Sequence, residues 1–203
     1  MRIAHFGATG RVGSRIVVEA LRRGHQVTAI ARAPGDLKSQ PNLIFQRGDV
    51  NQEGEVARLA ADHDAVFSSV KFQALQPRVL IAGVKGSGVN RLLVVGGAGS
   101  LEVAPGVQLV DTPGFPEAYK SEAIPGRDFL NLLRGEEQLE WTFLCPSAEF
   151  APGTRTGKFR LGKDQLLTQP SGESRISMED FAIAFIDELE NPKHIRERFT
   201  VGY

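Results

Sequence analysis

The sequence is short of the features that mark secreted, membrane-spanning and nucleic-acid-binding proteins. Its 203 residues include a single cysteine, Cys145, so no disulfide can form within the chain and nothing indicates an oxidising compartment. Lysine and arginine (24) balance aspartate and glutamate (24), which leaves no net charge to attract a nucleic acid or an anionic membrane. No apolar run approaches the roughly 18 residues of a membrane span, and the run from Met1 to Phe6 lacks the basic leader of a signal peptide. We therefore expect a soluble, cytoplasmic protein whose partners are small molecules rather than nucleic acids or membranes.

Strand-length apolar stretches alternate with stretches of helical periodicity, which is the pattern of βαβ units on a parallel sheet. A length of 203 residues suits one domain. The pattern therefore predicts a single Rossmann-type domain over residues 1–203, an α/β fold in which a doubly wound parallel sheet carries helices on both faces. The expected strands span residues 2–6, 26–31, 43–46, 65–70, 91–95 and 141–145.

The expected helices carry recognisable end signals. Asn51 is expected to cap the second helix, and Pro77 suits the first turn of the third. Residues 117–134 are expected to be mostly helical, with a distortion at Pro125-Gly126. Ser177, followed three residues later by Asp180, resembles a capping box for the last one.

Two stretches break this alternation. Residues 96–116 are rich in glycine and proline and longer than an ordinary connection, so we expect them to form a loop over the active site. Residues 150–176, together with 195–203, are expected to form a small appended segment on the substrate side. Within it, residues 158–161 and 165–168 are expected to pair as a hairpin.

The segment between the first expected strand and the first expected helix has a GxxGxxG spacing. It reads Gly7-Ala8-Thr9-Gly10-Arg11-Val12-Gly13. Dinucleotide-binding turns need glycine here because the chain turns tightly, its N–H groups approach a diphosphate closely, and the helix packs tightly on the strand. The context of strand, turn and helix predicts a nicotinamide dinucleotide site at residues 7–13, and a glycine turn that binds nothing is the alternative.

The end of the second strand indicates which nicotinamide cofactor is bound. An acid there accepts hydrogen bonds from the ribose 2′-OH of NAD, whereas an arginine pairs with the 2′-phosphate of NADP. This sequence has Arg32 and no acid until Asp36, and Arg11 in the glycine turn is a second candidate partner for the phosphate. The sequence thus favours NADP(H) over NAD(H), unless Arg32 is an ordinary surface arginine.

Asp49 and Val50 follow the third strand and are candidates for the adenine site. The carboxylate of Asp49 can accept a hydrogen bond from the adenine amino group while Val50 covers the ring. Asp49 is equally plausible as a turn residue or as part of the next helix cap. His5 lies within the first strand, and we interpret it as a packed core residue rather than a ligand or catalyst.

With further motifs, the sequence resembles the atypical short-chain dehydrogenases, a family with NmrA-like members and NAD(P)H-flavin and biliverdin reductase relatives. The resemblance covers nearly the whole chain and rests on residues 7–13, 48–50, 92–100, 139–146 and 175–182. It implies that the loops after the fourth, fifth and sixth strands surround the nicotinamide. The residues implied are Ser68, Ser69, Val70 and Lys71 beside the ribose or phosphates, Gly97 and Ala98 beneath the ring, and Pro146, Ser147 and Ala148 against the carboxamide.

The sequence departs from the family's better-known catalytic pattern. A standard short-chain dehydrogenase needs a serine at the end of the fifth strand and a Tyr-xxx-Lys motif, because the tyrosine must donate a proton to the carbonyl. Here Gly96–Gly99 replace the serine, and no Tyr-xxx-Lys exists. Ser100, Tyr119 and Lys120 remain candidates for orienting an acceptor, although Tyr119 and Lys120 are equally interpretable as exposed helix residues. Cys145, in an apolar strand, is expected in the core.

These features lead to one hypothesis and one alternative. The hypothesis is an NADPH-dependent reductase that transfers hydride to a flavin, quinone or similar planar acceptor, with FMN or FAD as candidate substrates, because such a ring delocalises the incoming charge itself. The alternative is a non-catalytic NADP(H)-binding sensor of the NmrA type. An epimerase or dehydratase is disfavoured by the missing acid and base. We expect no metal site, and a monomer or homodimer.

Overall fold

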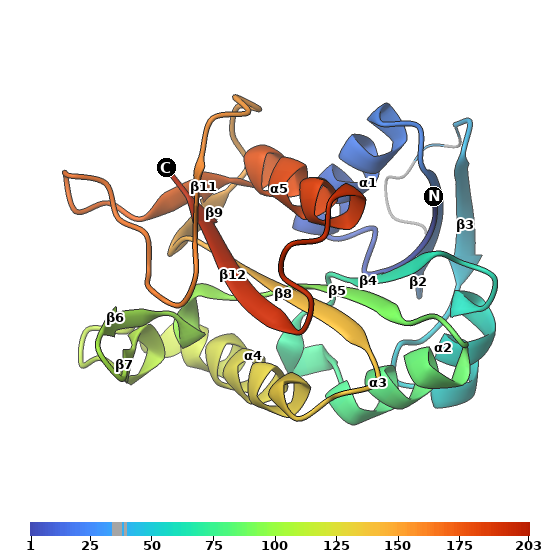
Figure 1. The fold of residues 1–203 in the computed structure, drawn as a ribbon, viewed down its shortest axis with the longest axis horizontal. Coiled ribbons are helices and arrows are strands. Elements are labelled where there is room, and N and C mark those ends of the chain that lie inside the picture. Colours follow the sequence, from blue (N-terminus) through green and yellow to red (C-terminus); the bar gives the residue numbers. More distant parts are fainter. Residues whose placement is uncertain (34–37, 39) are drawn as a thin grey trace.

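The computed structural model describes residues 1–33, 38 and 40–203 and centres on an eight-stranded sheet (Figure 1). The strands follow the order β10-β12-β8-β5-β4-β1-β2-β3 across the sheet. Neighbours are parallel except β10 and β12, which are antiparallel. Their bounds are β1 (Arg2–Phe6), β2 (Gln26–Ala31), β3 (Leu43–Arg47), β4 (Ala65–Ser68), β5 (Arg91–Val95), β8 (Glu140–Pro146), β10 (Arg160–Gly162) and β12 (Glu197–Gly202).

Helices cover both faces of the sheet, which confirms the predicted doubly wound Rossmann-type fold (Figure 1). On one face α1 (Arg11–Arg22) packs against α5 (Met178–Glu190). The other face carries α2 (Glu53–Ala60), α3 (Pro77–Gly86) and α4 (Glu117–Arg134), and Pro77 stands in the first turn of α3 as expected.

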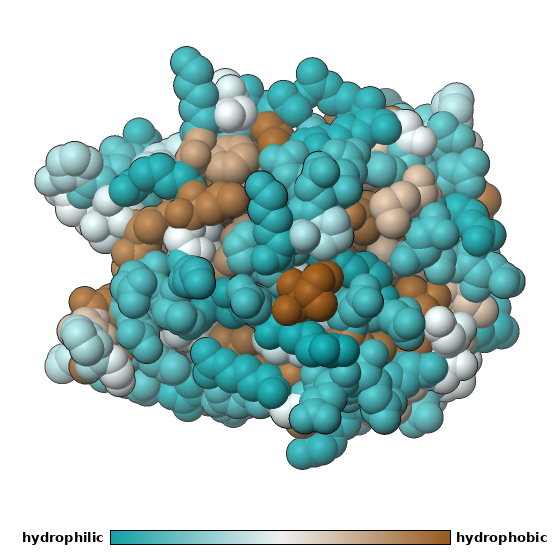
Figure 2. Space-filling model, viewed as in Figure 1, coloured by the Kyte–Doolittle hydropathy of each residue, from teal (hydrophilic) through white to brown (hydrophobic). Residues whose placement is uncertain are grey.

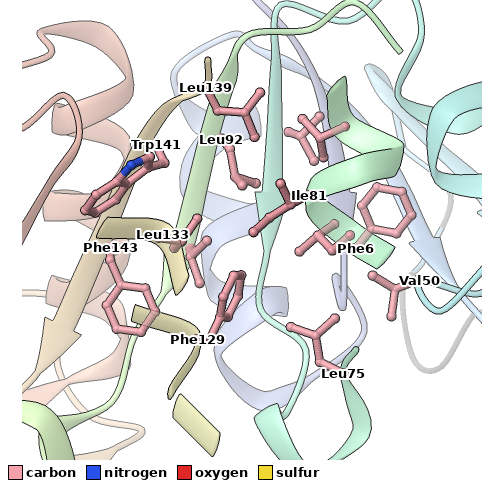
Figure 3. Close-up of a cluster of buried hydrophobic side chains, with 14 of the residues drawn as sticks. Phe6, Val50, Leu75, Ile81, Leu92, Phe129, Leu133, Leu139, Trp141 and Phe143 are labelled. Atoms are coloured by element: carbon pink, nitrogen blue, oxygen red, sulfur yellow. The ribbon is translucent and has the colours of Figure 1, made fainter. Parts of the chain in front are cut away.

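Each face of the sheet has its own apolar core, which explains why the strands read as apolar runs rather than as alternating patterns. Figure 3 shows the core under α2, α3 and α4, where Phe129 and Phe143 meet edge to face with ring centroids 6.1 Å apart. A fully buried phenylalanine side chain contributes about 1.5 to 3 kcal/mol. Outside these cores, hydrophilic side chains cover most of the face in Figure 2.

The expected cap of α2 is wrong. Gln52 precedes the helix, and no side chain among the described residues caps it. Asn51 instead bridges two loops: its Nδ2 donates to the Ala74 carbonyl (2.9 Å) and its Oδ1 accepts from the Gln76 N–H (2.7 Å). A short amide suits either role, so the residue type alone did not distinguish them.

The cap of α5 is confirmed. The Ser177 hydroxyl accepts from the Asp180 N–H at 3.0 Å. The Asp180 carboxylate does not return the bond to the cap residue, as a full capping box would require. It accepts instead from the N–H groups of Thr156 and Gly157, at 2.7 and 2.8 Å.

The predicted hairpin of residues 158–161 and 165–168 is wrong. β10 pairs with β12 at the edge of the central sheet, and Gln165 forms an isolated bridge with Glu102. β9 (Glu149–Ala151) and β11 (Arg175–Ser177) form a separate parallel pair. These are long-range pairings, which local turn signals do not reveal.

Residues 96–116 are more regular than the sequence suggested. They contain β6 (Glu102–Ala104) and β7 (Val107–Gln108), an antiparallel pair flanked by two short 3₁₀ turns. The fourth strand ends at Ser68, so Ser69 and Val70 belong to the loop that follows it. Over the described part of the chain, no helix combines the length and apolarity that a membrane crossing requires.

Candidate dinucleotide site

A cavity of about 460 Å³ lies at the carboxyl edge of the sheet, beside β1 and β4. The chain leaves β1 toward α1 on one face and leaves β4 toward α3 on the other, so this is the position where open α/β sheets bind ligands. The lining comes from the loops after β1, β2, β3 and β4. It comprises Phe6, Gly7, Thr9, Gly10, Ile30, Ala31, Arg32, Ala33, Gly48, Asp49, Val50, Asn51, Ser69, Val70, Lys71 and Ala74.

The glycine turn has the backbone geometry that its sequence implied. Gly7 has φ of +85°, and a Cβ there would lie 2.7 Å from the Ser69 carbonyl carbon. A Cβ at Gly13 would lie 2.2 Å from the Gly7 carbonyl oxygen, so α1 packs directly on the turn. No side chain among the described residues caps α1 at Gly10, which leaves the first amides of this helix available to an anion.

Among the other residues of the turn, Thr9 lines the cavity, whereas Ala8, Arg11 and Val12 do not. Ala8 is buried, and both Ala8 and Val12 pack in the core between the sheet and α1 and α5. Arg11 begins α1 with an exposed side chain and does not line the cavity. A diphosphate in the cavity would therefore face the backbone amides of this turn and, among its side chains, that of Thr9.

Arg32 lies at the ribose end expected for this class of fold. It directly follows β2, lines the cavity and is exposed. Asp36, the first acid after it, lies outside the described residues. The strand register also places Arg47 of β3 beside Ala31 of β2, a neighbour that sequence reasoning missed, although Arg47 does not line the cavity.

Asp49 has a turn role and also lines the cavity. Its carboxylate accepts from the Asn51 N–H at 3.0 Å, and its own N–H donates to Glu55 at 2.7 Å. Val50 is buried against the same cavity. The turn contacts leave the second carboxylate oxygen of Asp49 available to a ligand.

The loop after β4 forms the opposite wall through Ser69, Val70 and Lys71, whereas Ser68 is buried and does not line the cavity. Glu122 of α4 fixes the continuation of this loop, since its carboxylate accepts from the N–H groups of Phe72 (2.8 Å) and Gln73 (3.1 Å). The sequence contains no indication of this role for Glu122, because it shows only that the residue lies on an expected helix.

The residues implied for the nicotinamide's far side do not line this cavity. Gly97 and Ala98 follow β5, and Pro146 ends β8. Ala148 is exposed just beyond it. Ser147 is fully buried and its hydroxyl donates to the Val201 carbonyl at 3.0 Å, so this side chain faces β12.

The three candidate catalytic side chains are not brought together. Ser100 is 3% exposed, and its hydroxyl lies 3.4 Å from the Arg198 guanidinium and 3.9 Å from the Cys145 sulfur. Tyr119 is 66% exposed, and Lys120 forms an ion pair with Glu117 at 2.7 Å. Cys145 is buried as expected, and burial raises the pKa of its thiol, which opposes a nucleophilic role.

A second cavity, of about 480 Å³, lies along β9 and β11 and is bordered by the segment 152–158. Arg175, Lys158 and Tyr203 contribute to its lining. It shares no lining residue with the cavity beside β1 and β4. The glycine turn, the helix amides and Arg32 belong to the latter, so that cavity is the candidate dinucleotide site.

The doubly wound sheet and a glycine turn at the amino end of α1 define a nicotinamide dinucleotide-binding protein of the Rossmann class. A family model described as NAD(P)H-binding matches residues 7–192, and the chain belongs to this family, among the atypical short-chain dehydrogenases that its motifs resemble. The uncharacterized protein YwnB of Bacillus subtilis (strain 168) is 40% identical over 215 residues, covering 99% of this chain and 98% of YwnB.

Solved structures show the same relationship. A Bacteroides thetaiotaomicron protein provisionally named an epimerase is 44% identical, with a TM-score of 0.95 over 100% of this chain and 96% of its own. A Streptococcus pneumoniae TIGR4 protein provisionally named an NADH-flavin reductase is 35% identical, with a TM-score of 0.85 over 100% and 99%. A Burkholderia pseudomallei protein provisionally named an exported protein is 46% identical, with a TM-score of 0.91 over both full chains.

Proposed function

We propose that this protein is an NADPH-dependent reductase that passes hydride to a flavin, quinone or similar planar acceptor. The observation that carries the proposal is the composition of one cavity: a glycine turn with no room for a Cβ at Gly7 or Gly13, the start of α1 without a side-chain cap, and Arg32 directly after β2. A volume of about 460 Å³ is within the usual range for a small-molecule site.

Each part of the cavity has a role toward the cofactor. The amides at the start of α1 bind the diphosphate, because the positive end of the helix favours an anion. Arg32 pairs with the 2′-phosphate, and Asp49 and Val50 receive the adenine. Ser69, Val70 and Lys71 support the nicotinamide ribose, and NADPH, when bound, supplies the hydride.

None of the three candidate side chains, Ser100, Tyr119 and Lys120, lines the cavity as a proton donor, and this favours one class of acceptor. Reduction of an aliphatic carbonyl needs a proton donor at its oxygen, whereas Ser100 is buried and Lys120 is paired with Glu117. A flavin or quinone spreads the incoming charge over its own ring and takes its proton from solvent. Positioning of the two rings then supplies most of the rate enhancement. The provisional flavin-reductase name of the Streptococcus relative agrees with this choice, and the epimerase name of the Bacteroides relative does not.

Absorbance at the nicotinamide band tests the proposal directly. The protein is mixed with NADPH and FMN, riboflavin or a benzoquinone, and the same reactions are repeated with NADH. We expect oxidation that depends on the protein and is faster with NADPH. Tight binding of NADPH without turnover of any acceptor would favour the sensor function instead, and the absence of binding would exclude both.

A further inference from the structure

A buried histidine lies directly beneath the glycine turn. His5 of β1 is fully buried, two residues before Gly7, and its Nε2 lies 2.8 Å from the Ser69 hydroxyl. The ring packs edge to face on Phe67, with centroids 5.6 Å apart. It does not line the dinucleotide cavity, so it acts on a ligand only through its neighbours.

The Ser69 hydroxyl joins three elements at one point. It donates to the Gly7 carbonyl at 3.0 Å, and it would lie 2.6 Å from a Cβ on Gly13 of α1. The Gly7 carbonyl in turn accepts from the Gly10 N–H at 3.0 Å. The orientation of one serine hydroxyl is therefore linked to the bond that closes the glycine turn.

The protonation state of His5 follows from these contacts. Ser69 has one hydroxyl hydrogen, and the Gly7 carbonyl (3.0 Å), the Phe6 carbonyl (3.4 Å) and the Nε2 of His5 (2.8 Å) all lie within its reach; when a carbonyl accepts it, Nε2 is the donor to Ser69. Its Nδ1 has no partner among the described residues, so the tautomer with its hydrogen on Nε2 leaves only an acceptor unpaired, whereas the other tautomer would bury an N–H without an acceptor, which is the rarer case. Burial also lowers the pKa of His5 to about 3, so the ring is neutral at physiological pH.

We infer that His5 is a positioning residue for the dinucleotide: by donating to Ser69, it holds the hydroxyl that sets the Gly7 carbonyl and so shapes the diphosphate-binding turn. This inference rests on the proposed function for its ligand. The arrangement of the turn itself does not, and it can be tested in the protein without cofactor.

The test compares variants that keep or remove the donor. His5→Gln keeps an N–H at the position of Nε2, whereas His5→Leu removes it, and Ser69→Ala removes the acceptor with little change in volume. His63→Leu is a matched control, because the Nε2 of His63, in the loop before β4, bonds the hydroxyl of Thr28 in β2 at 2.8 Å and neither residue lines the cavity.

Two readouts are measured. In the absence of cofactor, hydrogen exchange at the Gly10 amide, whose bond to the Gly7 carbonyl closes the turn, should be about tenfold faster in His5→Leu and Ser69→Ala, and unchanged in His5→Gln and His63→Leu, since one such bond corresponds to about a factor of ten. The Kd for NADPH should rise about tenfold in the first two variants only. Combining His5→Leu with Ser69→Ala should add nothing to Ser69→Ala alone.

The outcomes separate the inference from the proposed function. Exchange and Kd values equal to those of the unmodified protein in His5→Leu and Ser69→Ala would overturn the inference. Changes in exchange rate and in Kd that were as large in His5→Gln as in His5→Leu would also overturn it, because the N–H kept by glutamine would then make no difference and His5 would act only through its packing. If the unmodified protein bound no nicotinamide nucleotide, the proposed function would fail, and the exchange rates alone would decide the role of His5. Ser69→Ala keeps the test valid if His5→Leu does not fold.

Discussion

Arg32 is the side chain on which the proposed preference for NADPH depends. Its guanidinium is exposed at the end of β2. A hydrogen bond to a charged group is worth about 1.5 to 3 kcal/mol, and solvent places this one at the low end of that range. Arg32→Ala should therefore weaken NADPH binding by about 1.5 kcal/mol and leave NADH binding almost unchanged, as measured by calorimetric titration with both nucleotides.

NADH serves as the internal control in this experiment, because it differs from NADPH only at the 2′ position. Equal losses for the two nucleotides would show that Arg32 does not contact the 2′-phosphate. Arg32→Lys should retain part of the preference, since a lysine keeps the charge but loses the bidentate geometry of a guanidinium.

Two neighbouring strands bring a second arginine to the same edge of the sheet. Ala31 and Arg47 are partners in the parallel pairing of β2 and β3. Leu43 packs in the core toward α1, and the alternation along a strand places Arg47 on that same face, where α1 begins. We predict that Arg47→Ala lowers the preference for NADPH over NADH about threefold, which corresponds to the roughly 0.5 to 1 kcal/mol of a solvated ion pair.

Salt provides the check on this prediction. The contribution of Arg47 should shrink as ionic strength rises from about 0.01 to 1 M, because the Debye length falls from about 30 to 3 Å. Arg58, an exposed arginine in the last turn of α2, is the matched control, and Arg58→Ala should leave the preference unchanged. A salt-independent effect, or the same loss in both variants, would contradict a role for Arg47 at the 2′-phosphate.

The elements were predictable from the sequence to the extent that their signals are local. The predicted bounds of β1, β2, β5 and α4 agree with the structure to the residue, because buried parallel strands leave continuous apolar runs and a helix leaves a periodic apolar pattern. The pairing of β10 with β12 and the contact between Arg47 and Ala31 depend on residues far apart or on register, which no local pattern encodes.

The candidate site shows the same division. The glycine turn, Arg32 and Asp49 could be predicted, because the backbone conformation or the charge that each position needs is supplied by particular residue types. Asn51 was misread as a cap, and His5 was assigned to the core without its bond to Ser69, because both act through partners that only the fold supplies.

At the scale of the whole molecule, Asp180 joins three regions that are distant in the sequence. It is fully buried at the start of α5 and binds the backbone of Thr156 and Gly157. It also accepts from the hydroxyl of Tyr203, which follows β12, at 2.8 Å. The segment that borders the second cavity, the helix on one face and the end of the chain are thus held at one carboxylate.

This arrangement predicts how stability changes with pH. Burial alone would raise the pKa of Asp180, but the bonds from Thr156, Gly157 and Tyr203 outweigh it and hold the pKa below its ordinary value. The stabilisation is therefore complete above the unfolded pKa of about 3.9 and is lost as the pH falls through the lower folded value. In urea unfolding, Asp180→Asn should lower the free energy of unfolding by about 1.5 to 3 kcal/mol at pH 7. The gap from the unmodified protein should close below about pH 4. Asp187→Asn on the same helix, where the carboxylate is 52% exposed, should cost less than about 1 kcal/mol. A gap for Asp180→Asn that stayed constant from pH 7 to pH 3 would show that packing, rather than the charged hydrogen bonds, holds these regions together.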